Sequence, residues 1–80
     1  MKNVVVSIDS IDKVKRFVNA VSKFPVDFDL RSERYIVDAK SIMGILSMNL
    51  SKPIELSIHS DSDKEIKSIL AALGEFVIKA

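Results

Sequence analysis

The residue whose position most directly suggests chemistry is Ser41. It precedes a short segment, residues 42–48, that is apolar almost all the way round. Serine is among the preferred residues at the position before a helix, and a phosphate there would be stabilised by the helix dipole. A chain of 80 residues cannot bury every side chain of such a segment, so we expect part of it to remain exposed as a docking surface for another protein.

Ser41 and the segment after it each allow two interpretations. The hydroxyl can act only as a helix cap, or it can also be a kinase target, because a phosphorylated cap gains about 0.3–1 kcal/mol from the dipole. In the segment, one helix face can turn inward and leave Met43 and Leu46 outside. Methionine suits adaptable interfaces, so we expect a mostly exposed patch. The residues that could turn inward are Ile42, Ile45 and Met48.

Other candidates for covalent or metal chemistry are few. His59 is the single histidine and the chain has no cysteine, which excludes a multi-histidine metal cluster, a thiolate site and a disulfide framework. His59 has no clustered acid or second histidine near it in sequence, and we expect it to face solvent at a strand end. Ser10 is expected to cap a helix. The aspartate spacing matches no calcium loop, and we expect neither metal nor cofactor.

Composition and charge restrict the class of protein. Hydrophobic residues make up 48% of the chain, which contains only two glycines and two prolines, as is typical of a compact globular domain. We therefore expect one domain over residues 1–80. The net charge of +1 gives no indication of nucleic-acid binding. The apolar run at residues 4–6 is too short to cross a membrane, and we expect a cytoplasmic protein.

The period of the apolar residues alternates between strand and helix along the chain. Strands are predicted over residues 2–8, 26–30, 35–39 and 54–58. Helices are predicted over residues 11–21 and 41–49 and from residue 63 onward, where Ser62 and Glu65 have capping-box spacing. The apolar stripe of the last helix is formed by Ile66, Ile69, Leu70, Leu73, Phe76 and Val77. This βαββαβα order predicts an α+β fold, a four-stranded antiparallel sheet with three helices on one face.

The run KSIMG at residues 40–44 resembles the regulatory-serine segment of HPr, the histidine-containing phosphocarrier protein of the bacterial sugar phosphotransferase system. HPr also has the order βαββαβα, as an open-faced sandwich, and the resemblance is best over residues 35–73. It implies that Ser41 falls on the serine regulated in low-GC Gram-positive bacteria. It also implies that partners dock on Ile42, Met43 and Leu46, with Lys40 beside them.

The N-terminal half departs from this family. HPr carries a Gly-x-His-x-Arg-Pro-Ala signature before its first helix, where the histidine takes phosphate from Enzyme I and the arginine neutralises it. The histidine position falls at or beside Ser10, the arginine position near Asp12 and the proline position near Lys13. A serine phosphate ester is too stable to be a good relay, and Asp12 would repel a phosphate.

The resemblance and the missing signature together predict a non-enzymatic regulatory or adaptor protein, a monomer with HPr kinase, Enzyme I-like or regulator proteins as partners. One alternative is an active phosphocarrier with a displaced acceptor. Another, from a different class, is a ferredoxin-like RNA- or ligand-binding module, because that fold shares the order βαββαβ. Such a module would need aromatic side chains on its open sheet face, and Tyr35 is the one candidate besides four core-like phenylalanines.

Overall fold

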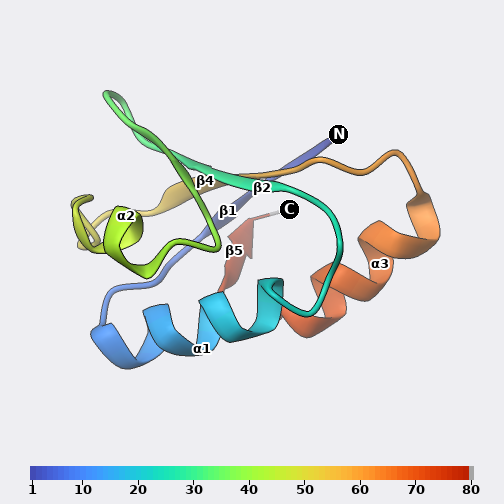
Figure 1. Cartoon of the computed structure of the whole chain (residues 1–80), viewed down its shortest axis with the longest axis horizontal. Helices are drawn as coiled ribbons and strands as arrows, with labels where there is room; N and C mark the ends of the chain where they lie inside the picture. Colours follow the sequence, from blue (N-terminus) through green and yellow to red (C-terminus); the bar gives the residue numbers. More distant parts are fainter. Residues whose placement is uncertain (80) are drawn as a thin grey trace.

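A computed structural model describes residues 1–79, which form one sheet and three helices (Figure 1). The elements are β1 (Lys2–Val6), α1 (Ile11–Val21), β2 (Phe28–Arg31), β3 (Ile36–Asp38), α2 (Ile42–Leu46), β4 (Ile54–Ile58), α3 (Asp63–Ala72) and β5 (Val77–Lys79). The strand order is β3-β2-β4-β1-β5, and every neighbouring pair is antiparallel. The predicted α+β class, with an antiparallel sheet and three helices, is confirmed.

The strands alternate between a buried face and an open face. In β4 the side chains of Ile54, Leu56 and Ile58 are at most 2% exposed, and they face the helices, which lie beneath the sheet in Figure 1. Charged residues such as Arg31 and Glu55, which are paired across β2 and β4, occupy the other face. This alternation of period two places a single core between the sheet and the helices.

The sheet has five strands in the described residues rather than the predicted four. The apolar stripe of the last helix was expected to continue through Phe76 and Val77, but α3 ends at Ala72 and a turn follows. Val77 then pairs with Val6, so that β5 covers the outer edge of β1. Leu73 and Phe76 are buried as expected, because a turn can bury them as well as a helix can. A short apolar tail does not distinguish the two.

Other elements are shorter than their sequence patterns suggested. The first strand ends at Val6 although Ile8 is fully buried, and α2 has five residues rather than nine. The turn between β2 and β3 is closed by the Ser32 N–H, which donates to the Tyr35 carbonyl at 2.9 Å. Apolar periodicity reports burial, whereas strand and helix ends depend on backbone hydrogen bonds.

A serine caps each of the three helices in residues 1–79. In every case the backbone N–H three residues later donates to the serine Oγ, at 3.1–3.2 Å, which satisfies one of the free amides of the first turn. The pairs are Ser10 with Lys13, Ser41 with Gly44, and Ser62 with Glu65. The capping positions predicted for these serines are confirmed.

The predicted capping box at Ser62 is only half formed. The Glu65 N–H donates to Ser62 Oγ, but the Glu65 carboxylate does not return to the Ser62 N–H. It accepts instead from Ser60 Oγ at 2.7 Å, and the Ser62 N–H donates to Ser60 Oγ at 3.2 Å. Ser60 is 8% exposed. The buried Ser60 hydroxyl therefore bridges the two groups: it donates to the Glu65 carboxylate and accepts from the Ser62 N–H.

Gly44 lets α2 approach β3 closely, and we expect Gly44→Ala to destabilise the protein. A Cβ at this position would lie 3.2 Å from Ser41 Oγ and 3.4 Å from Val37 Cβ. Alanine normally stabilises a helix by about 1 kcal/mol relative to glycine. Crowding should cost about 2 kcal/mol here, so the net free energy of unfolding should fall by about 1 kcal/mol. Urea denaturation of the two proteins measures the difference.

Gly74→Ala is the matched control. A Cβ there would meet only backbone oxygens, at 3.6 Å and 3.9 Å, and Gly74 does not have a positive φ. We expect this variant to be neutral or to gain up to about 1 kcal/mol. Equal stabilisation by the two substitutions would show that Gly44 is not constrained by its neighbours.

Candidate functional site

The exposed apolar residues of α2 form the first part of the candidate site. Met43 is 78% exposed, and Ile42 and Leu46 are each 40% exposed; we call these three residues the α2 patch. On the inner side, Ile45 is fully buried and Met48 is 6% exposed. The helix is therefore held to the core by its inner face and presents three apolar side chains to solvent.

Ser41 stands at the start of α2 and is half-buried. Its Oγ accepts the Gly44 N–H at 3.1 Å, and its own N–H donates to the Asp38 carbonyl at 3.0 Å. In the cap the Ser41 oxygen is an acceptor, so the cap does not use the hydroxyl proton. Hydrogen bonds therefore hold Ser41 through its backbone N–H and its Oγ, and neither of them uses the hydroxyl proton.

The ammonium group of Lys40 is bound by other parts of the protein and is not a free surface cation. Its Nζ donates to the Phe24 carbonyl at 2.9 Å and lies 5.7 Å from the centre of the Phe28 ring. The ammonium group thereby ties the residue before Ser41 to the segment after α1, with a cation–π contribution from Phe28.

The start of α1 is the second part of the site, because the resemblance places the phosphohistidine there. Ser10 is exposed and accepts the Lys13 N–H at 3.1 Å. Lys13 also forms an ion pair with Asp9 at 3.2 Å. Asp12 lies in the first turn, where a phosphate would meet its negative charge. The start of α1 thus has a serine cap, one acid in its first turn and the Asp9–Lys13 ion pair, but no imidazole.

Ile11 is an exposed apolar residue, although it stands at helical spacing from the buried residues of α1. Its side chain is 60% exposed, whereas Val14, Phe17 and Val21 are buried. Arg16, on another side of α1, pairs with Glu75 at 3.1 Å. Ile11 therefore adds apolar surface at the start of α1, and helical spacing alone does not predict its exposure.

His59 lies far along the sheet from the start of α1. Strands β1 and β4 are antiparallel, so the end of β4 that leads into His59 lies beside the start of β1, whereas Ser10 follows the end of β1. The imidazole is partly exposed, as predicted, and its Nε2 lies 2.7 Å from Asp29 Oδ2. The structure therefore does not bring His59 to the position of the family histidine.

Other kinds of site find no support in residues 1–79. This part of the chain contains no group of three acids or histidines arranged to hold a metal ion. None of its helices has the length and apolar character that a membrane span requires. The aromatic side chains needed on an open sheet face for RNA binding are also missing from its strands, because Phe28 is buried and Tyr35 lies in the turn before β3.

Comparison with known proteins gives a family match over most of the chain. The model described as "PTS HPr component phosphorylation site" matches residues 13–79. The match begins after Ser10 and includes the whole of α2.

Two solved structures are similar over nearly the whole chain. HPr-C-His from Thermoanaerobacter tengcongensis is 32% identical with a TM-score of 0.73, and the alignment covers 94% of this chain and 92% of that chain. The phosphocarrier protein HPr from Bacillus anthracis str. Ames is 28% identical with a TM-score of 0.63, over 89% of this chain and 92% of that chain. By sequence and by fold, this chain belongs to the HPr family of the phosphotransferase system.

Proposed function

We propose that this member of the HPr family is a cytoplasmic, monomeric regulatory or adaptor protein that docks its partners through the α2 patch and does not relay phosphate. The observation that carries the proposal is the pairing of an exposed α2 patch with a first helix that no histidine precedes. The part of the site that recognises proteins is present, and the part that would perform phosphotransfer is replaced.

The chemistry of the first turn of α1 supports the absence of a relay. A histidine phosphoramidate is labile and passes its phosphoryl group on, whereas an ester on Ser10 would be stable. Asp12 would oppose a phosphate by like-charge repulsion. Arg16 pairs with Glu75, so a phosphate would have to compete with that carboxylate for its charge.

The α2 patch supports docking because its exposure is costly unless a partner covers it. Three neighbouring apolar side chains on one short helix are a typical protein-binding surface, and Met43 can adapt to differently shaped partners. The buried Ile45 fixes the helix below them. A partner would therefore meet a preformed surface, with little ordering cost on this side.

Ser41 is the proposed regulatory residue, modified by an HPr kinase that docks on the α2 patch. Its Oγ accepts a single described hydrogen bond, from Gly44, which a phosphate oxygen could replace. Phosphorylation would add nearly two negative charges at the edge of an apolar surface. A partner that recognises the unmodified patch would then bind less well, or a partner with arginine residues would bind better.

Incubation with phosphoenolpyruvate and Enzyme I should leave this protein without acid-labile phosphate, because no imidazole stands at the start of α1. Intact mass spectrometry at neutral and at acid pH measures this, with the phosphocarrier protein HPr from Bacillus anthracis as the positive control. Stoichiometric phosphate on Ser10 or His59 would instead establish a carrier with a displaced acceptor.

Ser41→Ala should abolish labelling by ATP and HPr kinase. The matched control is Ser62→Ala, because both serines are helix caps with the same hydrogen-bond pattern. Each substitution should lower the free energy of unfolding by about 1 kcal/mol, but only the first should remove the phosphate. Equal labelling of Ser41→Ala and the wild-type protein would leave Ser41 as a cap alone.

Met43→Glu should weaken docking to HPr kinase by about tenfold or more and leave the free energy of unfolding within about 0.5 kcal/mol of the wild-type value. Ile78→Glu is the control, since Ile78 is also exposed, at 56%, but lies on β5. Isothermal titration calorimetry and circular dichroism measure the two quantities. If both variants bind like the wild-type protein, α2 is not the docking surface.

A further inference from the structure

We propose that a cavity beside the C-terminal end of α2 receives an acidic side chain of the partner that covers the α2 patch. This inference rests on the proposed docking function and adds the chemistry of the partner. Three observations support it: the size of the cavity, its position next to the α2 patch, and the charged side chains that line it.

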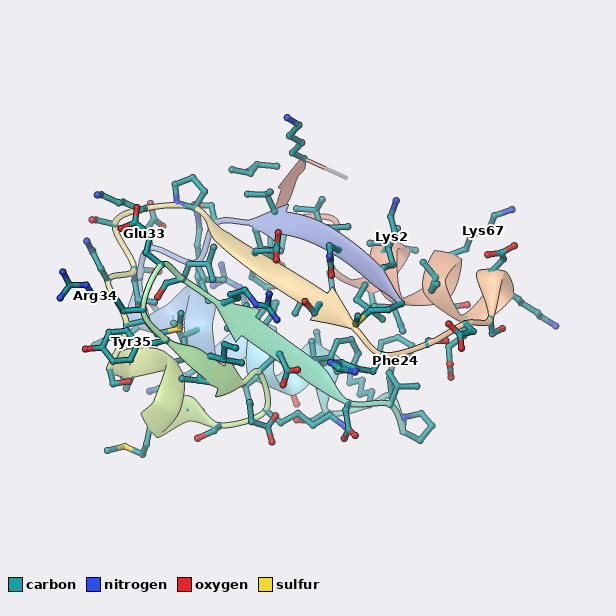
Figure 2. The ribbon with its side chains drawn as sticks, turned by 90° about the horizontal axis from the view of Figure 1, so that it is seen from above. Lys2, Phe24, Glu33, Arg34, Tyr35 and Lys67 are labelled. Carbon is teal, nitrogen blue, oxygen red and sulfur yellow. The ribbon has the colours of Figure 1, made fainter. Side chains whose placement is uncertain are left out.

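The cavity lies between two turns and has a volume of about 240 Å³. The β2–β3 turn contributes Glu33, Arg34 and Tyr35, which Figure 2 shows together at one end of the sheet, and the loop before β4 contributes Asn49, Lys52 and Pro53. Small-molecule sites usually occupy about 300–1,000 Å³. The size of this cavity is therefore better suited to a single side chain.

Both walls of the cavity are fixed by their own hydrogen bonds. The Ser32 N–H donates to the Tyr35 carbonyl across one turn. In the other loop, Asn49 Oδ1 accepts from the N–H and the hydroxyl of Ser51, at 3.1 Å and 2.6 Å. The buried Ile54 lies at the cavity as well. A partner side chain would enter a cavity that is already formed.

The cavity continues the α2 patch. Asn49 follows Leu46 by three residues, and β3, which leaves the other turn, contacts α2. Figure 1 shows the β2–β3 turn, α2 and the loop before β4 at the same end of the molecule. One partner surface can therefore cover the α2 patch and reach the cavity.

The charges around the α2 patch indicate which side chain the cavity favours. Residues 41–51 carry no charged side chain at all, and Lys40 is tied to Phe24. Any preference for a partner of one charge must therefore come from charged side chains at the edges of the patch. At the cavity, Arg34 and Lys52 form none of the ion pairs described for residues 1–79. Together with Glu33, they give the lining of the cavity a net charge of +1. Arginine binds carboxylates in a bidentate manner.

The test uses two matched peptides and the ¹⁵N-labelled protein. One peptide is an acetylated and amidated helix of leucine and glutamate, and the other has lysine in place of every glutamate. We expect the acidic peptide to shift the amide signals of α2, Arg34 and Lys52, to bind at least about tenfold more tightly than the basic peptide, and to weaken as sodium chloride is raised.

The double variant Arg34→Gln/Lys52→Gln should bind the acidic peptide about tenfold more weakly. Lys64→Gln/Lys67→Gln on α3 changes the net charge equally and should bind like the wild-type protein. The inference is overturned if the acidic peptide does not bind at millimolar concentration, if the two double variants behave alike, or if inorganic phosphate alone saturates the same amides. Binding to α2 without charge preference would remove the cavity proposal and leave the docking function standing.

Discussion

The pairing of β4 with both β1 and β2 is the interaction on which the rest of this structure depends. β4 is the central strand of the sheet, between β2 and β1, and its inward side chains are among the most buried. Its register with β1 decides which loops meet at each end of the sheet. A slip of one residue would turn Leu56 to solvent and separate the parts of the site.

The small core explains why α2 leaves apolar side chains exposed to solvent. A chain of 80 residues has limited interior volume, and the sheet, α1 and α3 fill most of it. Only Ile45 and Met48 from the segment of α2 reach the core. Ile42, Met43 and Leu46 remain exposed. Their apolar character favours burial, but the fold leaves them in contact with solvent. Such conflicts are expected at functional surfaces.

The proposed docking surface and the phosphotransfer position of the family lie on different elements. The α2 patch depends on the core contacts of α2, whereas phosphotransfer in the family depends on residues before α1. At the family's histidine position, Ser10 caps α1. Farther along the same helix, Phe17 packs against Phe76, with ring centres 5.4 Å apart. The exposed α2 patch is therefore built without any contribution from the residues before α1.

The sequence by itself determined the α+β class, the serine caps and most residues of the core, because apolar period and capping chemistry are local properties. It also indicated the α2 patch, through a segment too apolar to be buried whole. Only the tertiary structure decided that residues 77–79 form a fifth strand, that Ile11 is exposed, and that Arg34 and Lys52 share a cavity. These features depend on contacts between segments far apart in the chain. A local sequence pattern does not predict which strand edge or which turn a distant segment will contact.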